Sequence, residues 1–263
     1  MRTLIFSVLA LLCTALGHAQ AVKARLLSEI ELETDRFLGA DELGNLFYMD
    51  DQVLYRKSGN REFSFSNFDL GEVSQVDVSN PFKILLFYKE FNSVIILDNN
   101  LNELSERLDF TKETQFNNVL FVGNSSQNNI WLYADDNKLH LYNYQLLAEE
   151  IQTQALTFYQ EDFEALGLVS TFKKAWIQSE NEVLCFNEYG NYLETYSIQG
   201  ADRIFPFFKG LICYKDGTFT YRTVDQSRPV DLQHKGPVEG ISVSGSSLFI
   251  YDGNKVLQYA LTL

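Results

Sequence analysis

The sequence predicts an all-β fold, a six-bladed β-propeller whose ring is closed by the N-terminal strand. An apolar run, two to four polar residues and a second apolar run recur along the chain, which is the pattern of a β-hairpin. The copies recur every 36 to 45 residues, as a repeat of short strands typical of a propeller blade does. Their equivalent positions are Tyr48, Tyr88, Tyr133, Gln178, Tyr214 and Tyr251.

The second repeat illustrates one blade, whose four strands we name A to D from the central channel outward. Residues 73–79 alternate polar and apolar side chains, which favours strand A, lining the channel with polar groups. A turn at Pro81 leads to the wholly apolar run 84–88, typical of a strand B buried on both sides between neighbouring blades. Strands C and D are expected at 93–98 and 101–110.

The two ends of the chain supply the closure. The last repeat provides three strands, 238–244, 246–252 and 255–263, and lacks a fourth. The segment 22–32 has a strand pattern without hairpin partners of its own. Pairing it with the last strand completes the sixth blade and removes an open sheet edge.

The N-terminus has the pattern of a secretory signal peptide over residues 1–19. Arg2 precedes an apolar segment from Leu4 to Leu16, and Gly17 to Ala19 provide a small-residue cleavage site. A membrane anchor would need a longer apolar segment, and lipidation at Cys13 would need a small residue in place of Leu12. We therefore expect a single propeller domain over 20–263, exported to the periplasm.

The amino-acid composition restricts the classes of molecule that the protein is expected to bind. The formal net charge of −14 disfavours nucleic acid and anionic membrane surfaces, and no later segment has the apolar length of a spanning helix. Cys185 and Cys213 lie in apolar strand patterns, where buried free thiols are expected and a disulfide is the alternative. The expected partner is another cell-envelope protein, bound without direct membrane insertion.

Catalytic motifs are absent from the sequence, so no enzyme activity, catalytic residue, cofactor or metal is predicted. His140 is expected to be packed in a strand and His234 to be exposed in a loop. Asp and Asn residues at 50–51, 98–100 and 135–137 resemble calcium ligands, but turns favour the same residues. Candidate channel residues for a metal-dependent hydrolase are scattered: Asp41, Gln75, Asp77, Asn118 and Glu239.

The two faces of the propeller are expected to differ in charge. The B–C turns are acidic, whereas the A–B and C–D turns contain Lys57, Lys83, Lys173, Lys174 and Lys209. Aromatic residues in the B–C turn near 91 and in the longest connection, 157–169, predict an interface on the acidic face. The predicted interface residues are Phe91, Phe158, Tyr159, Phe163, Asp135 and Asp136. The run 204–208 is expected to place phenylalanines in the channel.

The segment VDVSNPFKILLFY at 76–88, followed by VIILDNNLNEL at 94–104, resembles a group of exported β-propeller proteins of Bacteroidota. That group includes the periplasmic protein that plugs the giant outer-membrane translocon of the type 9 secretion system. The resemblance implies closure of the periplasmic end of an export channel by protein contact. It covers the second blade best.

Three functions therefore compete. The first is a non-catalytic propeller that docks on an envelope protein, with the export translocon as the partner that the resemblance implies. The alternatives are a glycan-binding propeller that uses exposed aromatics and a metal-dependent propeller hydrolase.

Overall fold

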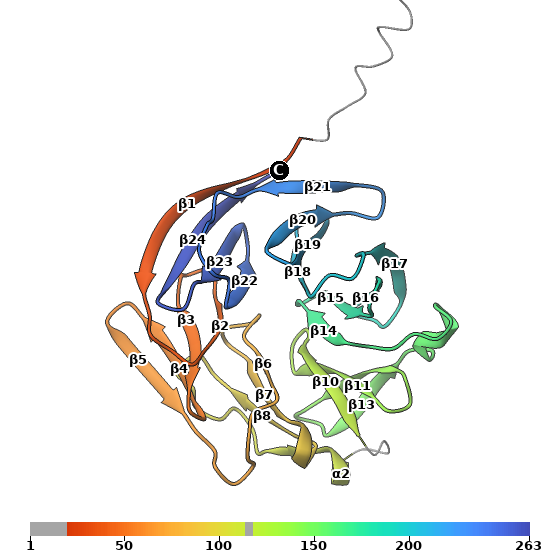
Figure 1. The fold of residues 1–263 in the computed structure, drawn as a ribbon. Helices are drawn as coiled ribbons and strands as arrows, with labels where there is room; N and C mark the ends of the chain where they lie inside the picture. Colours follow the sequence, from red (N-terminus) through yellow and green to blue (C-terminus); the bar gives the residue numbers. More distant parts are fainter. Residues whose placement is uncertain (1–19, 114–117) are drawn as a thin grey trace, which may run out of the picture.

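The computed structural model describes residues 20–113 and 118–263, so the predicted signal peptide at 1–19 lies outside the described residues. These residues fold into four four-stranded sheets and one eight-stranded sheet, arranged as a ring around a centre (Figure 1). The all-β class is confirmed. Among the described residues, no helix has the length and apolarity needed to cross a membrane.

Each of the first five sequence repeats forms one unit of four antiparallel strands, and the last repeat supplies three strands that β1 joins; the units are numbered along the chain. Unit 1 is β2 (Arg36–Ala40), β3 (Leu46–Asp50), β4 (Val53–Ser58) and β5 (Arg61–Phe65). Unit 2 is β6 (Gln75–Asp77), β7 (Ile84–Tyr88), β8 (Ser93–Leu97) and β9 (Leu108–Asp109). Unit 3 is β10 (Val119–Asn124), β11 (Asn129–Ala134), β12 (Leu139–Asn143) and β13 (Ala148–Gln152).

The remaining units complete the ring. Unit 4 is β14 (Gly167–Ser170), β15 (Lys174–Gln178), β16 (Glu182–Asn187) and β17 (Tyr192–Ser197). Unit 5 is β18 (Arg203–Phe207), β19 (Gly210–Lys215), β20 (Thr218–Arg222) and β21 (Ser227–Asp231). Unit 6 is β22 (Gly240–Ser244), β23 (Ser247–Tyr251), β24 (Lys255–Thr262) and β1 (Val22–Glu31). Short helical turns are η1 (Lys89–Phe91), α2 (Phe110–Glu113) and η2 (Leu156–Phe158).

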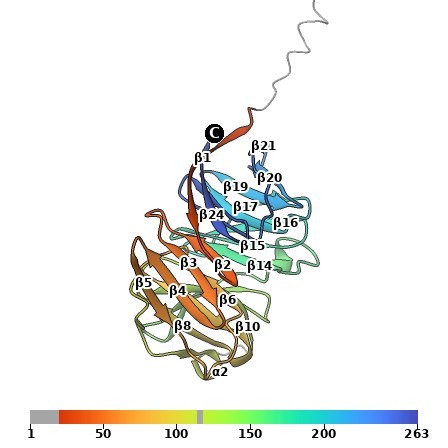
Figure 2. The ribbon, with the colours of Figure 1, turned by 60° about the vertical axis from the view of Figure 1, so that its left-hand side comes forward.

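Strand β1 closes the ring from the other end of the chain. It pairs antiparallel with β24 from Lys23 opposite Thr262 to Glu31 opposite Lys255, so the predicted terminal pairing is confirmed. Figure 2 shows β1 running along the side of the ring beside β24. Val22 and Lys23 also pair in parallel with β21, which the sequence did not predict. Units 5 and 6 consequently share one eight-stranded sheet.

The apolar core lies between neighbouring units. All five residues of β7 and of β8 are buried, as expected for strands covered on both faces. Leu85 and Phe87 of β7, for example, belong to one cluster with Ile130 and Leu132 of β11. Each unit is therefore stabilised mainly by the side chains that it shares with its neighbours.

The outer strand of unit 2 is shorter than predicted. Only Leu108–Asp109 pairs as β9, together with a single bridge between Leu97 and Glu103. The Asp98 carboxylate accepts the backbone N–H groups of Asn100 and Asn102, at 2.7 and 2.9 Å, which stabilises a turn where the strand was expected to begin.

Candidate protein-binding surfaces

The turns between strands define two opposite faces, because consecutive strands of a unit run in opposite directions. We call the side with the A–B and C–D turns the A–B face. It includes the A–B turns 41–45, 78–83, 125–128, 171–173, 208–209 and 245–246. We call the opposite side, with the B–C turns and the D–A connections, the B–C face.

The B–C face is acidic, as the sequence predicts. Most of its turns place exposed carboxylates in solvent. These are, among others, Asp35, Asp51, Asp69, Glu90, Asp135, Glu161, Asp162, Glu164, Glu180, Asp202, Asp216 and Glu239. A surface of one charge attracts cations and repels anions over about 8 to 10 Å at physiological salt.

The aromatic residues that were predicted as interface anchors differ in their exposure to solvent. Phe91, in η1, and Phe158, in η2, are 46% and 75% exposed. Phe163 is only 4% exposed and belongs to the core between units 3 and 4, so its prediction as a surface anchor is wrong. The connection 157–169 folds back onto unit 4, which buries this ring.

Tyr159 is half-buried rather than fully free. Its ring stacks on Tyr192 of β17, with ring centroids 4.9 Å apart, and meets Phe186 edge-on at 5.4 Å. Phe158 adds an edge contact to Tyr159 at 5.2 Å. These rings form a small aromatic cluster at the rim between units 3 and 4, and Phe158 is its exposed end.

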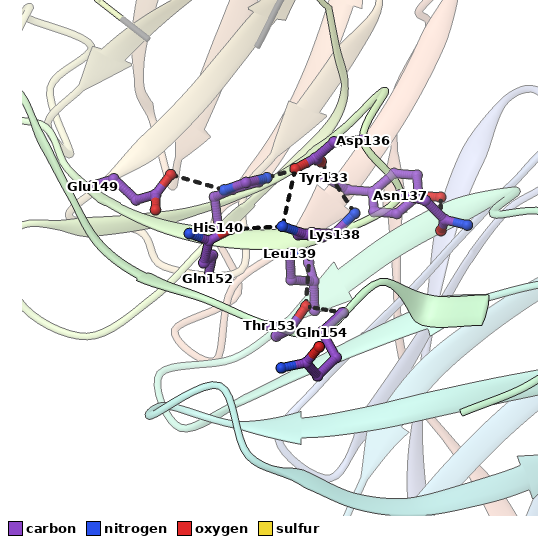
Figure 3. A network of polar contacts seen from close by, with 10 residues as sticks. All are labelled: Tyr133, Asp136, Asn137, Lys138, Leu139, His140, Glu149, Gln152, Thr153 and Gln154. Atoms are coloured by element: carbon purple, nitrogen blue, oxygen red, sulfur yellow. Dashed lines mark hydrogen bonds and ion pairs between the residues drawn. The ribbon is translucent and has the colours of Figure 1, made fainter. Parts of the chain in front are cut away.

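The two predicted aspartates lie in the same B–C turn but differ in their contacts, and Figure 3 shows those of Asp136. Asp135 is exposed. Asp136 Oδ1 lies 3.0 Å from Nε2 of His140, whose Nδ1 lies 2.9 Å from Glu149 Oε2. His140 is 2% exposed, and through it the network links the turn to β12 and β13. Asp136 therefore has a structural role in the fold. His140 is thus packed, as predicted.

The A–B face carries exposed apolar side chains that the sequence analysis overlooked. Four of its A–B turns each present one large apolar residue that is 55% to 79% exposed. These residues are Leu43, Phe82, Phe172 and Phe208. The C–D turns on the same face add Leu146, Leu147, Tyr189 and Val224. A repeated Phe-Lys pair, at 82–83, 172–173 and 208–209, was the signal in the sequence that could have revealed this pattern.

Lys83 was predicted to be an exposed charge of this face, and that is wrong. Its side chain is buried, and Nζ donates to the carbonyl oxygens of Ser125, Gln127 and Asn129 at 2.8, 2.9 and 2.7 Å. Burial lowers the pKa of Lys83 to about 8. The ammonium group ties unit 2 to the A–B turn of unit 3 and is covered from solvent.

The central channel has a mixed lining, so the expected polar lining is confirmed in part: Gln75, Asp77 and Ser79 face it, together with apolar side chains. A hollow of about 400 Å³ opens at the A–B face. Its apolar wall residues include Val78, Val169, Phe205, Pro206, Ile241 and Val243. The predicted entry of the 204–208 run into the channel is therefore confirmed for Phe205, whereas Phe207 is buried in the core and Phe208 is exposed.

The polar channel residues bond to neighbouring units. The Gln75 side-chain amide donates to Val122 O at 2.7 Å and accepts from Val122 N at 3.1 Å. The Asp77 carboxylate accepts the backbone N–H of Asn124 at 2.8 Å. These side chains substitute for backbone pairing between β6 and β10, which explains why polar residues alternate in that strand.

The other candidate ligands are placed apart. Asp41 is buried and accepts N–H groups within its own turn, whereas Asn118 and Glu239 are exposed on the B–C face. Within residues 20–113 and 118–263, no group of three or more His, Cys, Asp or Glu side chains has an arrangement that could hold a metal ion. Cys185 and Cys213 are buried free thiols, and burial raises the pKa of each.

His234 differs from its prediction as an exposed loop residue. It is half-buried, with Nδ1 3.3 Å from the Tyr259 hydroxyl and Nε2 3.1 Å from Pro237 O.

Comparisons with known proteins identify the architecture. No protein-family model matches the chain, and no curated protein sequence matches it significantly. The WD40 domain of Neurospora crassa Pan2 is 15% identical with a TM-score of 0.55, over 86% of this chain and 75% of that chain. Virginiamycin B lyase from Staphylococcus aureus is 11% identical with a TM-score of 0.56, over 86% and 80%.

A third solved structure, BBS1N in complex with ARL6DN, is 11% identical with a TM-score of 0.55, over 92% of this chain and 98% of that chain. At these identities the likeness is one of fold, and the fold is that of β-propellers.

Proposed function

We propose that the chain is a non-catalytic, protein-binding β-propeller with six blades, in which the eight-stranded sheet counts as two blades joined through β1. The observation that carries the proposal is the placement of large exposed apolar residues at the tips of four A–B turns. Turn tips of this kind are where interfaces place their anchors, because a partner can desolvate a protruding side chain completely.

At its most specific, the proposal is a periplasmic protein that docks on a large outer-membrane complex and plugs the periplasmic end of the type 9 secretion translocon. Its support is the signal-peptide pattern at 1–19 and the resemblance carried by 76–88 and 94–104. A disc-shaped domain with an acidic face and an apolar face is suited to binding in one orientation.

The experiment is affinity purification of the tagged chain from the cell envelope, followed by mass spectrometry. We expect an outer-membrane translocon subunit to co-purify in stoichiometric amount. Recovery of the chain alone from a gently solubilised envelope would contradict a protein-binding function. Recovery with an unrelated envelope protein would retain protein binding and reject the translocon.

Glycan binding is a second candidate because of the aromatic cluster between units 3 and 4. Sugar rings stack on exposed aromatic faces, and Phe158 presents such a face beside the stacked pair of Tyr159 and Tyr192. Glycan-array binding that Phe158→Asn abolishes would favour this candidate over a protein partner.

A further inference from the structure

We infer that the docking surface is the A–B face and that its occupant is an apolar peptide segment of another protein, flanked by carboxylates. This inference rests on the proposed function and names the face and the chemistry of its partner. The site consists of an apolar rim formed by Leu43, Phe82, Phe172 and Phe208 around the channel mouth, whose lining is mixed.

The backbone of the rim turns is held without help from the apolar side chains. In unit 1, Asp41 Oδ1 accepts the backbone N–H groups of Leu43 and Asn45, both at 2.9 Å. In unit 2, Asn80 Oδ1 accepts the backbone N–H of Phe82 at 3.0 Å. The turn geometry therefore depends on the polar residues, and nothing in the fold requires Leu43 or Phe82 to be apolar.

Phe208 is more informative because its backbone is strained. Its φ is +49°, in the left-handed region that favours Gly and Asn and is a rare conformation for a bulky residue. The ring touches Phe207 edge-on, with centroids 4.7 Å apart, but remains 71% exposed. Neither the turn nor the core explains a phenylalanine here, and strained residues of this kind concentrate at functional sites.

The hollow inside this rim has a mixed wall. Aliphatic and aromatic side chains alternate with polar ones such as Glu42, Thr171 and Ser244, and some of the other polar groups are bonded within the fold. Asp77 accepts from Ser79 N at 2.8 Å and Asn124 N at 2.8 Å, and Ser242 Oγ accepts from Ala40 N at 3.3 Å. A volume of about 400 Å³ lies within the range of ligand-binding pockets, roughly 300 to 1,000 Å³. Apolar side chains from a partner would pack on its apolar wall, and polar groups of the same segment would face the polar lining.

The charged side chains near the rim indicate which residues should flank the apolar part of the bound peptide. In the A–B turns, the exposed charged side chains are Lys173, Lys209 and Glu42. Each lysine follows an exposed phenylalanine directly, so the ammonium groups border the apolar rim. The B–C face, by contrast, is lined with carboxylates. The outer C–D turns of the same face also expose Glu103, Glu106 and Asp225, so the positive charge is local to the rim. Acidic groups beside the apolar residues of the occupant would pair with Lys173 and Lys209 there.

A direct test uses two matched variants and anilinonaphthalene sulfonate, a small apolar anion, as the probe. The first variant combines Phe172→Asn with Phe208→Asn on the A–B face. The second, called the B–C variant, combines Phe91→Asn on the B–C face with Phe158→Asn at the rim between units 3 and 4, which removes the same number of exposed rings away from the A–B turns. Asn tolerates the left-handed backbone at 208, so both variants are expected to keep the wild-type thermal midpoint.

We expect saturable fluorescence enhancement with the wild type and the B–C variant, and at least about tenfold weaker binding with the A–B variant. The estimate follows from two truncated anchors at ~1 kcal/mol each, with 1.4 kcal/mol per tenfold. Lys173→Gln with Lys209→Gln should weaken probe binding and reduce its salt dependence. No binding to the wild type, or greater loss with the B–C variant, would overturn the site.

The same variants separate this inference from the proposed function. A purified partner that binds the wild type and the B–C variant equally, and the A–B variant at least about tenfold more weakly, supports both. A partner lost only with the B–C variant keeps the function and overturns the face. Absence of any partner overturns the function and the peptide occupant together. Sedimentation with phosphatidylcholine vesicles that requires Phe172 and Phe208 would assign the surface to a membrane instead.

Discussion

The two faces of the propeller are built from the same kind of turn, yet they use different residues at the turn tips. On the B–C face the tips present carboxylates, and the aromatic Phe163 folds into the core. On the A–B face the tips present Leu43, Phe82, Phe172 and Phe208, while the charged Lys83 is buried. The exposed surface therefore differs from what the residue types alone indicate: one face is acidic, and the other has exposed apolar residues at its turn tips.

Both faces depend on one closed scaffold, and breaking it should give the largest effect. Deletion of residues 20–33 removes β1 and its eight paired positions along β24. At ~1 kcal/mol net per hydrogen bond, we expect a loss of about 5 kcal/mol or more in the free energy of unfolding. Urea denaturation measures it, with Leu27→Ser, at an exposed position of the same strand, as the control. Equal midpoints for the deletion and the wild type would refute the closure.

The second-largest change in stability is expected from the contrast between the buried Lys83 and an exposed lysine on the A–B face. Lys83→Met leaves two buried carbonyl groups and one partly buried carbonyl group without their donor, and we expect a loss of about 3 kcal/mol in the free energy of unfolding. Lys173→Met, in the equivalent Phe-Lys pair, should change it by less than about 0.5 kcal/mol. Similar losses for the two variants, by urea denaturation at pH 7, would remove the distinction.

The pH dependence sharpens the same contrast. The folded protein releases the Lys83 proton at about pH 8, whereas the unfolded chain keeps it to a pH near 10.5. The unfolded state binds more protons between these values, so stability contributed by this group rises with pH there and is lost as pH falls through 8. Between pH 7 and 9.5 the wild type should gain about 2 kcal/mol relative to Lys83→Met. A constant difference between the two proteins would show that the ammonium is not held as described.

On the B–C face, the comparison predicts that part of the acidic charge is structural. His140→Leu removes the partner that Asp136 and Glu149 share, and we expect a loss of about 2 kcal/mol in the free energy of unfolding. His234→Gln, at the other described histidine, is the matched control and should cost less than about 1 kcal/mol. The order of the two midpoints in a urea titration checks this prediction, and the reverse order contradicts it.

The smallest effect concerns the turn carboxylates of the B–C face as metal ligands. If they serve solvation and turn formation, EDTA should leave the thermal midpoint of the purified protein within about 1 °C, because a bound metal would stabilise the folded state by mass action. Calorimetry with and without EDTA measures the difference. A fall of several degrees would require a metal site that the two-face comparison does not contain.

The sequence predicted those parts of the fold that depend on local patterns. The wholly apolar run at 84–88 became the buried β7, and the unpaired strand pattern at 22–32 became β1. Periodicity identifies such strands because burial on both faces requires a continuous apolar run, and burial on one face requires alternating apolar and polar residues. The parallel contact of β1 with β21 involves only two residue pairs and leaves no such mark.

The surfaces were harder to predict because burial of a single side chain depends on contacts distant in sequence. Lys83 is covered by carbonyl groups 42 to 46 residues further along the chain. Phe163 is buried by unit 4, which follows it. Both residue types are usually assigned by average behaviour, lysine to the surface and an aromatic in a polar loop to an interface. In each case the three-dimensional neighbours decided otherwise.

Hydrogen–deuterium exchange of the chain, free and bound to its purified partner, tests the central claim most directly. The account predicts slower exchange in the complex at the A–B turns 78–83, 171–173 and 208–209, with unchanged exchange at 89–92 and 156–164. Protection confined to 89–92 and 156–164, with the A–B turns unchanged, would contradict it.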